Sequence, residues 1–150
     1  MTKLKRTNSE DTDFQKLVRL LDEYLEIKDG KDHSFYAQYN KIDMIKNVVV
    51  YYDHDIAIGC GAFKEFDKET VEIKRMFVQP DFRGKGIGEI ILKELECWAS
   101  EINYSVSILE TGKKQPEAIR LYQKSGYLIM PNYGQYENVE NSVCMKKAIK

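Results

Sequence analysis

The sequence predicts one domain, residues 1–150, of the α/β (α+β) class, in which helices flank a mixed, mostly antiparallel sheet. The chain has 150 residues, of which 43% are hydrophobic, and this is enough to bury one core. Its middle third contains three consecutive β-rich segments separated by short polar turns, which is typical of an antiparallel meander. Its last third alternates helical and strand patterns, which indicates a parallel pair of strands.

The first helix is expected from Thr12 to near Gly30. Thr12, with Gln15 three residues later, has the spacing of a helix-capping box. A short polar-flanked lead, residues 3–6, precedes it, and a weaker pattern over residues 33–40 suggests a short second helix. Apolar side chains recur along the first helix at helical spacing: Phe14, Leu17, Val18, Leu21, Tyr24 and Leu25.

The middle third carries the patterns of strands. Residues 48–52 are a run of β-forming side chains, and residues 56–63 follow them after a polar turn at 53–55. A second polar turn at 65–69 precedes another β-rich segment, residues 70–79. Because both connections are short, we expect these three strands to pair antiparallel with one another.

A glycine-rich turn then leads into a second clear helix. One face of that helix is apolar, with Ile87, Ile90, Ile91, Leu95 and Trp98. Residues 104–109 form the next strand, and a further helix begins at Pro116 and ends at residues 125–126. Residues 127–130 and 142–149 are the last two strands, joined by a loop rich in tyrosine, asparagine and glycine.

The composition argues against several classes of function. Lys and Arg number 23 against 24 Asp and Glu, so the net charge is −1 and no global field favours nucleic acid or an anionic membrane. The longest apolar run is far shorter than the roughly 20 residues of a membrane span, and the first residues have no apolar signal segment. We therefore expect a cytoplasmic protein. Three cysteines without a CxxC pair and two separated histidines predict neither disulfides nor a metal.

Chemistry is expected in the segment between the third meander strand and the following helix. Gly84, Gly86 and Gly88 allow backbone N–H groups to approach an anion there, and the helix N-terminus adds unpaired donors. Arg83 and Lys85 add full positive charges. The alternative is a tight structural turn, but three alternating glycines with two cations exceed what a turn requires. The segment therefore predicts an anion-binding loop.

The spacing of the glycines narrows the choice of anion. A dinucleotide fold needs a third glycine where Glu89 stands, and the phosphate loop GxxxxGK[ST] is absent. The remaining pattern, R-x-x-G-x-G after an apolar strand, resembles the pyrophosphate-binding signature of the GNAT superfamily of acetyl-CoA-dependent N-acetyltransferases. The run A-I-x-L-Y-x-x-x-G-Y over residues 118–127 is similar to this superfamily as well, and the resemblance covers about residues 3–149.

The resemblance implies a sheet that is split between two parallel strands, with acetyl-CoA bound in the split as co-substrate. In this chain the split is expected between residues 72–78 and 105–110. Gln115 stands where the family usually has asparagine, and it can still hydrogen-bond the cofactor. The cofactor-binding residues implied are Met76, Phe77, Val78, Arg83, Gly84, Lys85, Gly86, Ile87, Gly88 and Gln115.

Transfer to an amine needs a base, because an alkyl ammonium of pKa about 10.4 is mostly charged at neutral pH. Glu72, six residues before Val78, is the first candidate, since some members of the family carry a catalytic glutamate there; Glu110 is the second. The alternative for Glu72 is a surface ion pair with its neighbours Lys74 and Arg75. Strand alternation predicts Glu72, Lys74, Met76 and Val78 on one face, and Ile73, Arg75 and Phe77 on the other.

The resemblance also implies an acid and an oxyanion donor. Tyr122 matches the tyrosine that usually protonates the departing CoA thiolate, with a core aromatic as the alternative reading. A backbone N–H near Phe77 or Val78, where the strand bulges, is expected to face the oxyanion. Lys113 and Lys114 follow the second split strand and are expected to be solvated rather than cofactor-bound.

The predicted function is N-acetylation of a primary amine of a small molecule by direct transfer from acetyl-CoA. Aromatic residues are candidates for the acceptor pocket, with surface or dimer contacts as the alternative: Asn132, Tyr133 and Tyr136 in the late loop, and Tyr36 and Tyr39 after the first helix. The alternatives in function are a protein or peptide N-acetyltransferase and a non-catalytic CoA-binding regulatory module. Exposed apolar positions on the last strand are compatible with a homodimer.

Overall fold

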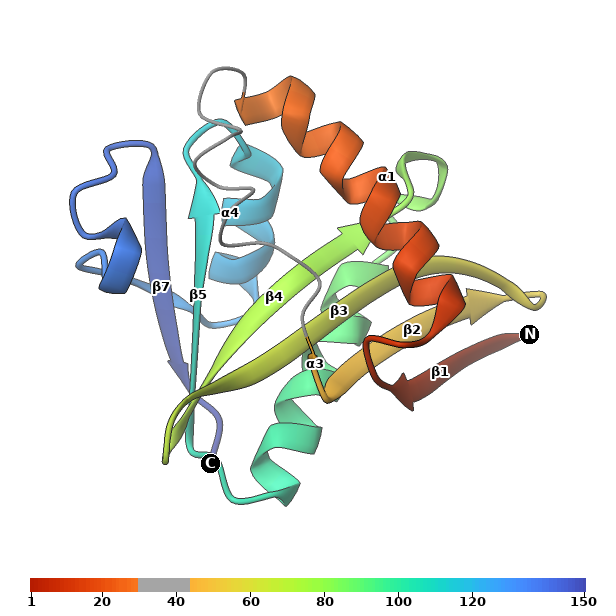
Figure 1. Cartoon of the computed structure of the whole chain (residues 1–150), viewed down its shortest axis with the longest axis horizontal. Helices are drawn as coiled ribbons and strands as arrows, with labels where there is room; N and C mark the ends of the chain where they lie inside the picture. The colour runs from red at the N-terminus through yellow and green to blue at the C-terminus, as the bar shows by residue number, and fades with distance from the viewer. Residues whose placement is uncertain (30–43) are drawn as a thin grey trace.

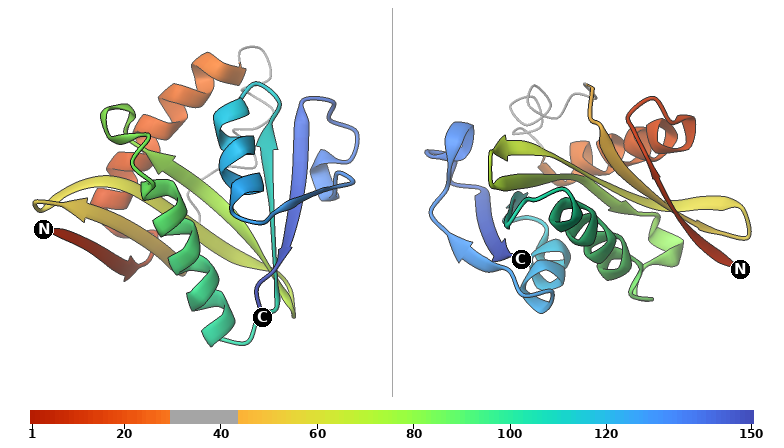
Figure 2. Two further views of the ribbon diagram at one scale, coloured as in Figure 1. Left: turned by 180° about the vertical axis from the view of Figure 1, so that it is seen from behind. Right: turned by 90° about the horizontal axis from the view of Figure 1, so that it is seen from below.

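The computed structural model describes residues 1–29 and 44–150. In this part of the chain a seven-stranded sheet has the order β1-β2-β3-β4-β5-β7-β6. Helix α1 covers one face, and α3 and α4 cover the other (Figure 1; Figure 2). The elements are β1 (Thr2–Thr7), α1 (Thr12–Asp29), β2 (Asn47–Asp53), β3 (Ile56–Asp67), β4 (Thr70–Val78), η2 (Pro80–Phe82), α3 (Ile87–Glu101), β5 (Val106–Gly112), α4 (Pro116–Lys124), β6 (Leu128–Met130), η3 (Gly134–Tyr136) and β7 (Ser142–Ala148).

The predicted fold class is confirmed, and so is the antiparallel meander β2-β3-β4. The predicted helices over the N-terminal segment, after the glycine loop and after Pro116 are also present. The weak helical pattern over residues 33–40 lies outside the described residues. The start of α1 differs from the prediction: Asp11, rather than Thr12, is the capping residue, because its Oδ1 accepts a hydrogen bond from the Phe14 N–H at 3.0 Å.

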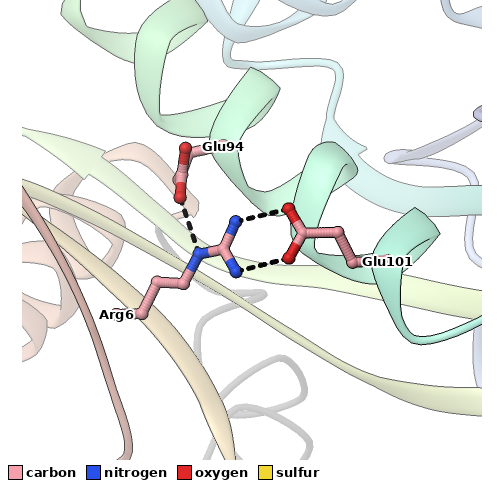
Figure 3. Close-up of polar contacts among 3 residues, drawn as sticks. All are labelled: Arg6, Glu94 and Glu101. Atoms are coloured by element: carbon pink, nitrogen blue, oxygen red, sulfur yellow. Dashed lines mark hydrogen bonds and ion pairs between the residues drawn. The ribbon is translucent and has the colours of Figure 1, made fainter.

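An additional edge strand, β1, occupies the polar lead before α1 and pairs antiparallel with β2. Arg6 anchors this strand to α3: its Nε lies 2.6 Å from Glu94, and its Nη1 and Nη2 lie 2.8 and 2.9 Å from the two Glu101 oxygens (Figure 3). The guanidinium also lies over the Trp98 ring, 5.0 Å from its centroid. Charged side chains of this kind are typical of a protected sheet edge.

Two apolar cores lie on opposite faces of the sheet. We call them the α1 core and the α3 core after the helix that packs on each. The α1 core contains Phe14, Leu17, Val18, Leu21, Ile45, Val48, Val50, Tyr52, Cys60, Ala62 and Phe77. The larger α3 core includes Val49, Tyr51, Ile58, Phe63, Val71, Ile73, Ile87, Ile91, Leu92, Leu95, Ala99, Leu109, Tyr122, Tyr127 and Met145.

Strand β4 carries a β-bulge near its middle. The register with β3 shifts so that Gly61 stands opposite two residues of β4, Arg75 and Met76. Arg75 has φ 61°, in the left-handed region that a residue with a side chain adopts rarely. Gly61 fits the close contact because an added Cβ there would lie 2.5 Å from the Met76 sulfur. The bulge bends the strand and moves the side chains that follow it to the other face.

The strand alternation predicted for β4 is therefore wrong beyond Lys74. Met76 packs with Ile73 against the α3 core, whereas Phe77 belongs to the α1 core. A regular strand would have placed Met76 on the face of Glu72 and Lys74. The observed arrangement puts Glu72, Lys74, Arg75 and Phe77 on the α1 side, and Val71, Ile73, Met76 and Val78 on the α3 side.

The expected split of the sheet lies between β4 and β5. These strands pair in parallel from Thr70↔Val106 to Glu72↔Ile108, and their pairing ends there. Beyond this point the two strands diverge towards their carboxyl ends, with α4 behind the opening (Figure 1). Pairing of β5 continues with β7 on its other side, from Val106↔Ala148 to Gly112↔Ser142. The carboxyl end of β4 thus keeps its pairing with β3 but has no paired strand on the β5 side.

Candidate functional site

A cleft of about 570 Å³ lies at the carboxyl end of β4, between α3 and α4. Of the twelve site residues that the sequence predicts, ten line it, and Lys85 and Glu72 do not. The lining residues are Leu21, Tyr24, Met76, Phe77, Val78, Phe82, Arg83, Gly84, Gly86, Ile87, Gly88, Glu89, Gln115, Glu117, Ala118, Arg120, Leu121, Tyr122 and Lys124.

The glycine loop forms one wall of this cleft. Gly84 and Gly86 have φ of 80° and 78°, and nothing lies within 4 Å of a Cβ added to either. Gly86 directly precedes α3, so the unpaired N–H groups of the first helical turn follow it. Gly88 has a different role, since a Cβ there would lie 3.2 Å from Leu121 of α4. The first two glycines leave backbone open to a ligand, and the third allows the two helices to pack closely.

The two cations of the loop are placed differently. Arg83 Nε donates to the Val78 carbonyl at 2.8 Å, and its guanidinium lies 4.8 Å from the centroid of the Tyr24 ring and 5.6 Å from that of Phe77. These contacts hold the guanidinium at the mouth of the cleft. Lys85 is exposed, with its Nζ 5.5 Å from the centroid of the Phe82 ring.

Two further cations, neither of them predicted from the sequence, reach the cleft from α4. Arg120 and Lys124 stand four residues apart, which places them on one side of the helix. Lys124 Nζ pairs with Glu89 of α3 at 2.9 Å. The i, i+4 spacing predicts that the two cations share one side of α4. Only the packing of α4 beside α3 shows that this side faces the cleft. Tyr24 and Leu21 are lining residues from α1 that were also missed.

A second, smaller pocket of about 110 Å³ occupies the open split itself. Five residues line both the cleft and this pocket: Leu21, Met76, Gln115, Ala118 and Tyr122. The two spaces are therefore adjacent, with Tyr122 and Gln115 at their boundary. Residues specific to the smaller pocket are Leu25, Glu72, Ile73, Lys74, Arg75, Glu110, Thr111 and Gly112.

Tyr122 is nearly enclosed at this boundary. Its side chain packs edge-on against Tyr127, with ring centroids 5.9 Å apart. Burial, and secondarily the negative charge of Glu110, raise the pKa of the Tyr122 phenol above its ordinary value. The phenol is therefore protonated at neutral pH and is available as a proton donor. Tyr122 is a core aromatic and a pocket residue at the same time.

Glu72 is buried in the split, with 4% of its surface exposed. Its Oε2 accepts a hydrogen bond from the Tyr133 hydroxyl at 2.7 Å, and its Oε1 lies 4.0 Å from Lys74 Nζ. Burial, and then the charge of Glu72, raise the pKa of Tyr133 so that it remains a donor. The expected ion pair with Lys74 exists, but it is buried rather than at the surface. Arg75 pairs with Asp22 of α1 instead, at 3.1 Å.

The late loop supplies this contact to Glu72. The side-chain amide of Asn132 donates to the carbonyls of Val139 and Ser142, both at 3.1 Å, and fixes the loop against β7. Tyr136 of the same loop is buried and packs edge-on against Tyr133. Tyr133 and Tyr136 line neither pocket directly. The predicted pocket residues Tyr36 and Tyr39 lie outside the described residues. Lys113 and Lys114 are exposed and line neither pocket, although they stand between the lining residues Gly112 and Gln115.

Residues 14–127 match the model of the acetyltransferase (GNAT) family. The chain belongs to this family. It is 38% identical over 93 residues to the IAA acetyltransferase of Azospirillum brasilense, and the match spans 61% of each chain. It is 31% identical over 100 residues to the N-acetyltransferase YsnE of Bacillus subtilis, spanning 65% of this chain and 66% of that one.

Solved structures share the whole architecture. A structure from Klebsiella pneumoniae described as an acyl-CoA N-acyltransferase has a TM-score of 0.83 at 28% identity, covering 100% of this chain and 99% of that one. The PaiA N-acetyltransferase of Thermoplasma acidophilum, solved in complex with coenzyme A, has a TM-score of 0.72 at 17% identity and covers 99% of both chains. The second likeness concerns the fold alone. Within residues 1–29 and 44–150, no helix has the length and apolar character needed to cross a membrane.

Proposed function

We propose that this protein is an N-acetyltransferase that transfers an acetyl group from acetyl-CoA directly to a primary amine of a small molecule. The proposal depends on one observation: the cleft and the small pocket are adjacent and share lining residues. A long cleft beside an anion-binding loop meets a small pocket that contains carboxylates, and Tyr122 lines both. Direct transfer requires the two substrates to meet at one point with a proton donor and a proton acceptor near it.

The cleft fits the chemistry of CoA. Gly84 and Gly86 leave space where a side chain would obstruct a phosphate, and the α3 N-terminus presents backbone donors with a partial positive charge. Arg83, Arg120 and Lys124 add full charges around it. When bound, acetyl-CoA supplies the acetyl group as a thioester. The glycine loop, the α3 N-terminus and the three cations would hold the phosphates of CoA. Met76 and Gln115 border the part of the cleft nearest the split.

Glu72 is the proposed base, with Glu110 as the second candidate. Both carboxylates line the small pocket, and Tyr133 holds one oxygen of Glu72 in place. The amine nitrogen would add to the acetyl carbon to give a tetrahedral oxyanion, and the carbon–sulfur bond would then break. Glu72 takes up the proton that the nitrogen loses, and Tyr122 gives its proton to the departing sulfur. The bulge at Arg75 and Met76 interrupts the β3–β4 ladder, and a backbone N–H just beyond it would stabilise the oxyanion.

The size of the split pocket favours a small acceptor over a protein. Its volume is about 110 Å³, against about 570 Å³ for the cleft. A free amine with a compact body fits this space better than a protein N-terminus, which needs a groove for the residues that follow it.

Release of free CoA thiol from acetyl-CoA in the presence of a panel of primary amines tests the proposal, with the acetylated product identified by mass spectrometry. We expect turnover that depends on the amine and is lost with Arg83→Ala. Lys93→Ala serves as the matched control, since Lys93 is an exposed α3 cation outside both pockets. Binding of acetyl-CoA with no amine-dependent release across the panel would favour a non-catalytic CoA-binding module instead.

A further inference from the structure

Two cations of β4 lie inside the acceptor pocket. Lys74 and Arg75 both line it, and their side chains are only 9% and 3% exposed. A buried cation is costly to desolvate and needs opposite charge nearby. Lys74 Nζ lies 4.0 Å from Glu72 Oε1, and Arg75 Nη1 lies 3.1 Å from Asp22 Oδ1. Burial lowers the pKa of Lys74, while Glu72 and Glu110 counter part of that effect.

The bulge brings these two adjacent residues to the same space. In a regular strand the side chains of Lys74 and Arg75 would point to opposite faces. The left-handed backbone of Arg75, φ 61°, turns its guanidinium towards α1, where Nη1 meets Asp22 at 3.1 Å. A guanidinium has five N–H donors in a planar fork, so this contact leaves further donor directions.

The charges that line the pocket balance. Glu72 and Glu110 are opposed by Lys74 and Arg75, so the formal sum of these four residues is zero. Such a lining matches a ligand that also carries both signs. A diamine or polyamine would bring a second ammonium group close to the two buried cations. Repulsion between these like charges would weaken its binding by several kcal/mol.

Resting on the proposed function, we infer that the acceptor is a small amine that also bears a carboxylate, of the amino-acid class. Its carboxylate is bound by Lys74 and Arg75, and its amine lies against Glu72 at the Tyr122 side of the pocket. The step is the one given above: the amine nitrogen gains the acetyl carbon, the carbon–sulfur bond breaks, and CoA leaves as the thiol. Lys74 and Arg75 determine specificity and take no part in proton transfer.

The test compares matched acceptors that differ only at the carboxylate. For phenylalanine and leucine, the amino acid, its carboxamide and its decarboxylated amine are assayed for CoA release with the native protein. The two analogues lack the carboxylate and therefore its charged hydrogen bonds. We expect the KM of the amino acid to be at least about tenfold lower than that of either analogue. Analogues that react as well as or better than the amino acids would overturn the inference and leave the proposed function intact.

Two variants sharpen the test. Lys74→Met keeps the length of the side chain and removes its charge. The lost contact with Glu72 affects every acceptor, so we expect the KM of the amino acid to rise about tenfold more than that of the amine. Lys93→Met, on the exposed side of α3, should change neither. An equal loss with all acceptors would make Lys74 a structural residue and contradict the assignment. The ranking of acceptors by the native protein does not depend on either variant. If no acceptor releases CoA, the proposed function fails, and this inference fails with it.

Discussion

The two buried glutamates Glu72 and Glu96 each lie near a lysine and a tyrosine, but only Glu72 lies next to a pocket. Glu72 lies beside Lys74 and Tyr133 in the split between β4 and β5. Glu96 of α3 pairs with Lys147 of β7 at 2.7 Å, and its charge contributes to the raised pKa of Tyr127. Glu72 lines the acceptor pocket, whereas Glu96 lines neither pocket.

The comparison shows that composition does not distinguish a reactive cluster from a structural one. Both contain an acid, a lysine and a tyrosine whose pKa is raised, first of all by burial. The difference is that the parallel pairing of β4 stops at Glu72, so space opens next to its carboxylate. Glu96 is instead paired with Lys147 of β7 at 2.7 Å and lines neither pocket. The following substitutions separate the two clusters.

The largest expected effect is on kcat, and it distinguishes Tyr122 from Tyr127, whose rings are in edge contact. Tyr122→Phe should lower kcat by about 10²-fold or more, because a proton donor at the leaving sulfur is lost. Tyr127→Phe should leave kcat nearly unchanged. It should instead reduce the free energy of unfolding by about 1–3 kcal/mol, since the buried Ser107 hydroxyl loses its 2.8 Å partner. Steady-state kinetics and denaturant unfolding of both variants make the comparison. Equal activity of the two variants would remove Tyr122 from the proposed chemistry.

The second largest effect is expected on kcat/KM when Glu72 is replaced. Glu72→Gln should lower kcat/KM by about 10²-fold near neutral pH, because the amide cannot accept the amine proton. The loss should shrink as the pH approaches the pKa of the amine, where the acceptor is already neutral. The pH dependence of kcat/KM for the native and variant proteins checks this. A pH-independent loss would indicate that Glu72 only shapes the pocket.

The matched change at Glu96 should affect stability instead. Glu96→Gln weakens the charged hydrogen bond to Lys147 and is expected to reduce the free energy of unfolding by about 1–3 kcal/mol. Activity per folded molecule should stay within about twofold of the native value because ordinary substitutions far from a site add independently. Urea unfolding and kcat measured on the same samples test both statements. A large drop in kcat would mean that the two clusters are coupled.

The smallest effect is expected at the exposed anchor of β1. Hydrogen bonds from Arg6 lower the pKa of Glu101 below its ordinary value. This pair therefore stabilises the fold above the ordinary carboxyl pKa, and the stabilisation is lost as the pH falls through the lower, folded-state value. Arg6→Ala should reduce Tm by a few degrees at pH 7 and by less at pH 3. Thermal unfolding at both pH values measures it, and a larger difference at low pH would contradict the ion-pair explanation.

Most of the fold was predictable because its signals are local. The 3.6-residue periodicity of α1 and α3 and the polar turns between the meander strands follow directly from residue spacing. Strand β1 was missed because only Leu4 of its side chains is apolar, so no alternation is visible. The resemblance implied a bulge near Phe77 or Val78, whereas the structure has it at Arg75 and Met76. The residue types did not show this position, since the residue with the left-handed backbone is Arg75 rather than glycine.

The candidate site was predictable where one short segment supplies it and not where distant segments meet. The glycine loop is contiguous, and its geometry follows from residues 83–88. The contact of Tyr133 with Glu72 joins residues 61 positions apart, and Arg120 and Lys124 reach the cleft only because α4 packs beside α3. Such contacts depend on tertiary packing, which local patterns do not encode.

The central claim is that the cleft beside the glycine loop binds acetyl-CoA, and calorimetric titration of the purified protein with acetyl-CoA tests it most directly. The native protein should bind one equivalent, and the double variant Arg83→Ala, Lys124→Ala should bind more weakly by tenfold or more, since each lost charged hydrogen bond costs about 1.5–3 kcal/mol. Lys93→Ala should bind like the native protein. No binding by the native protein at millimolar acetyl-CoA would contradict the account and leave the glycine loop as a structural turn.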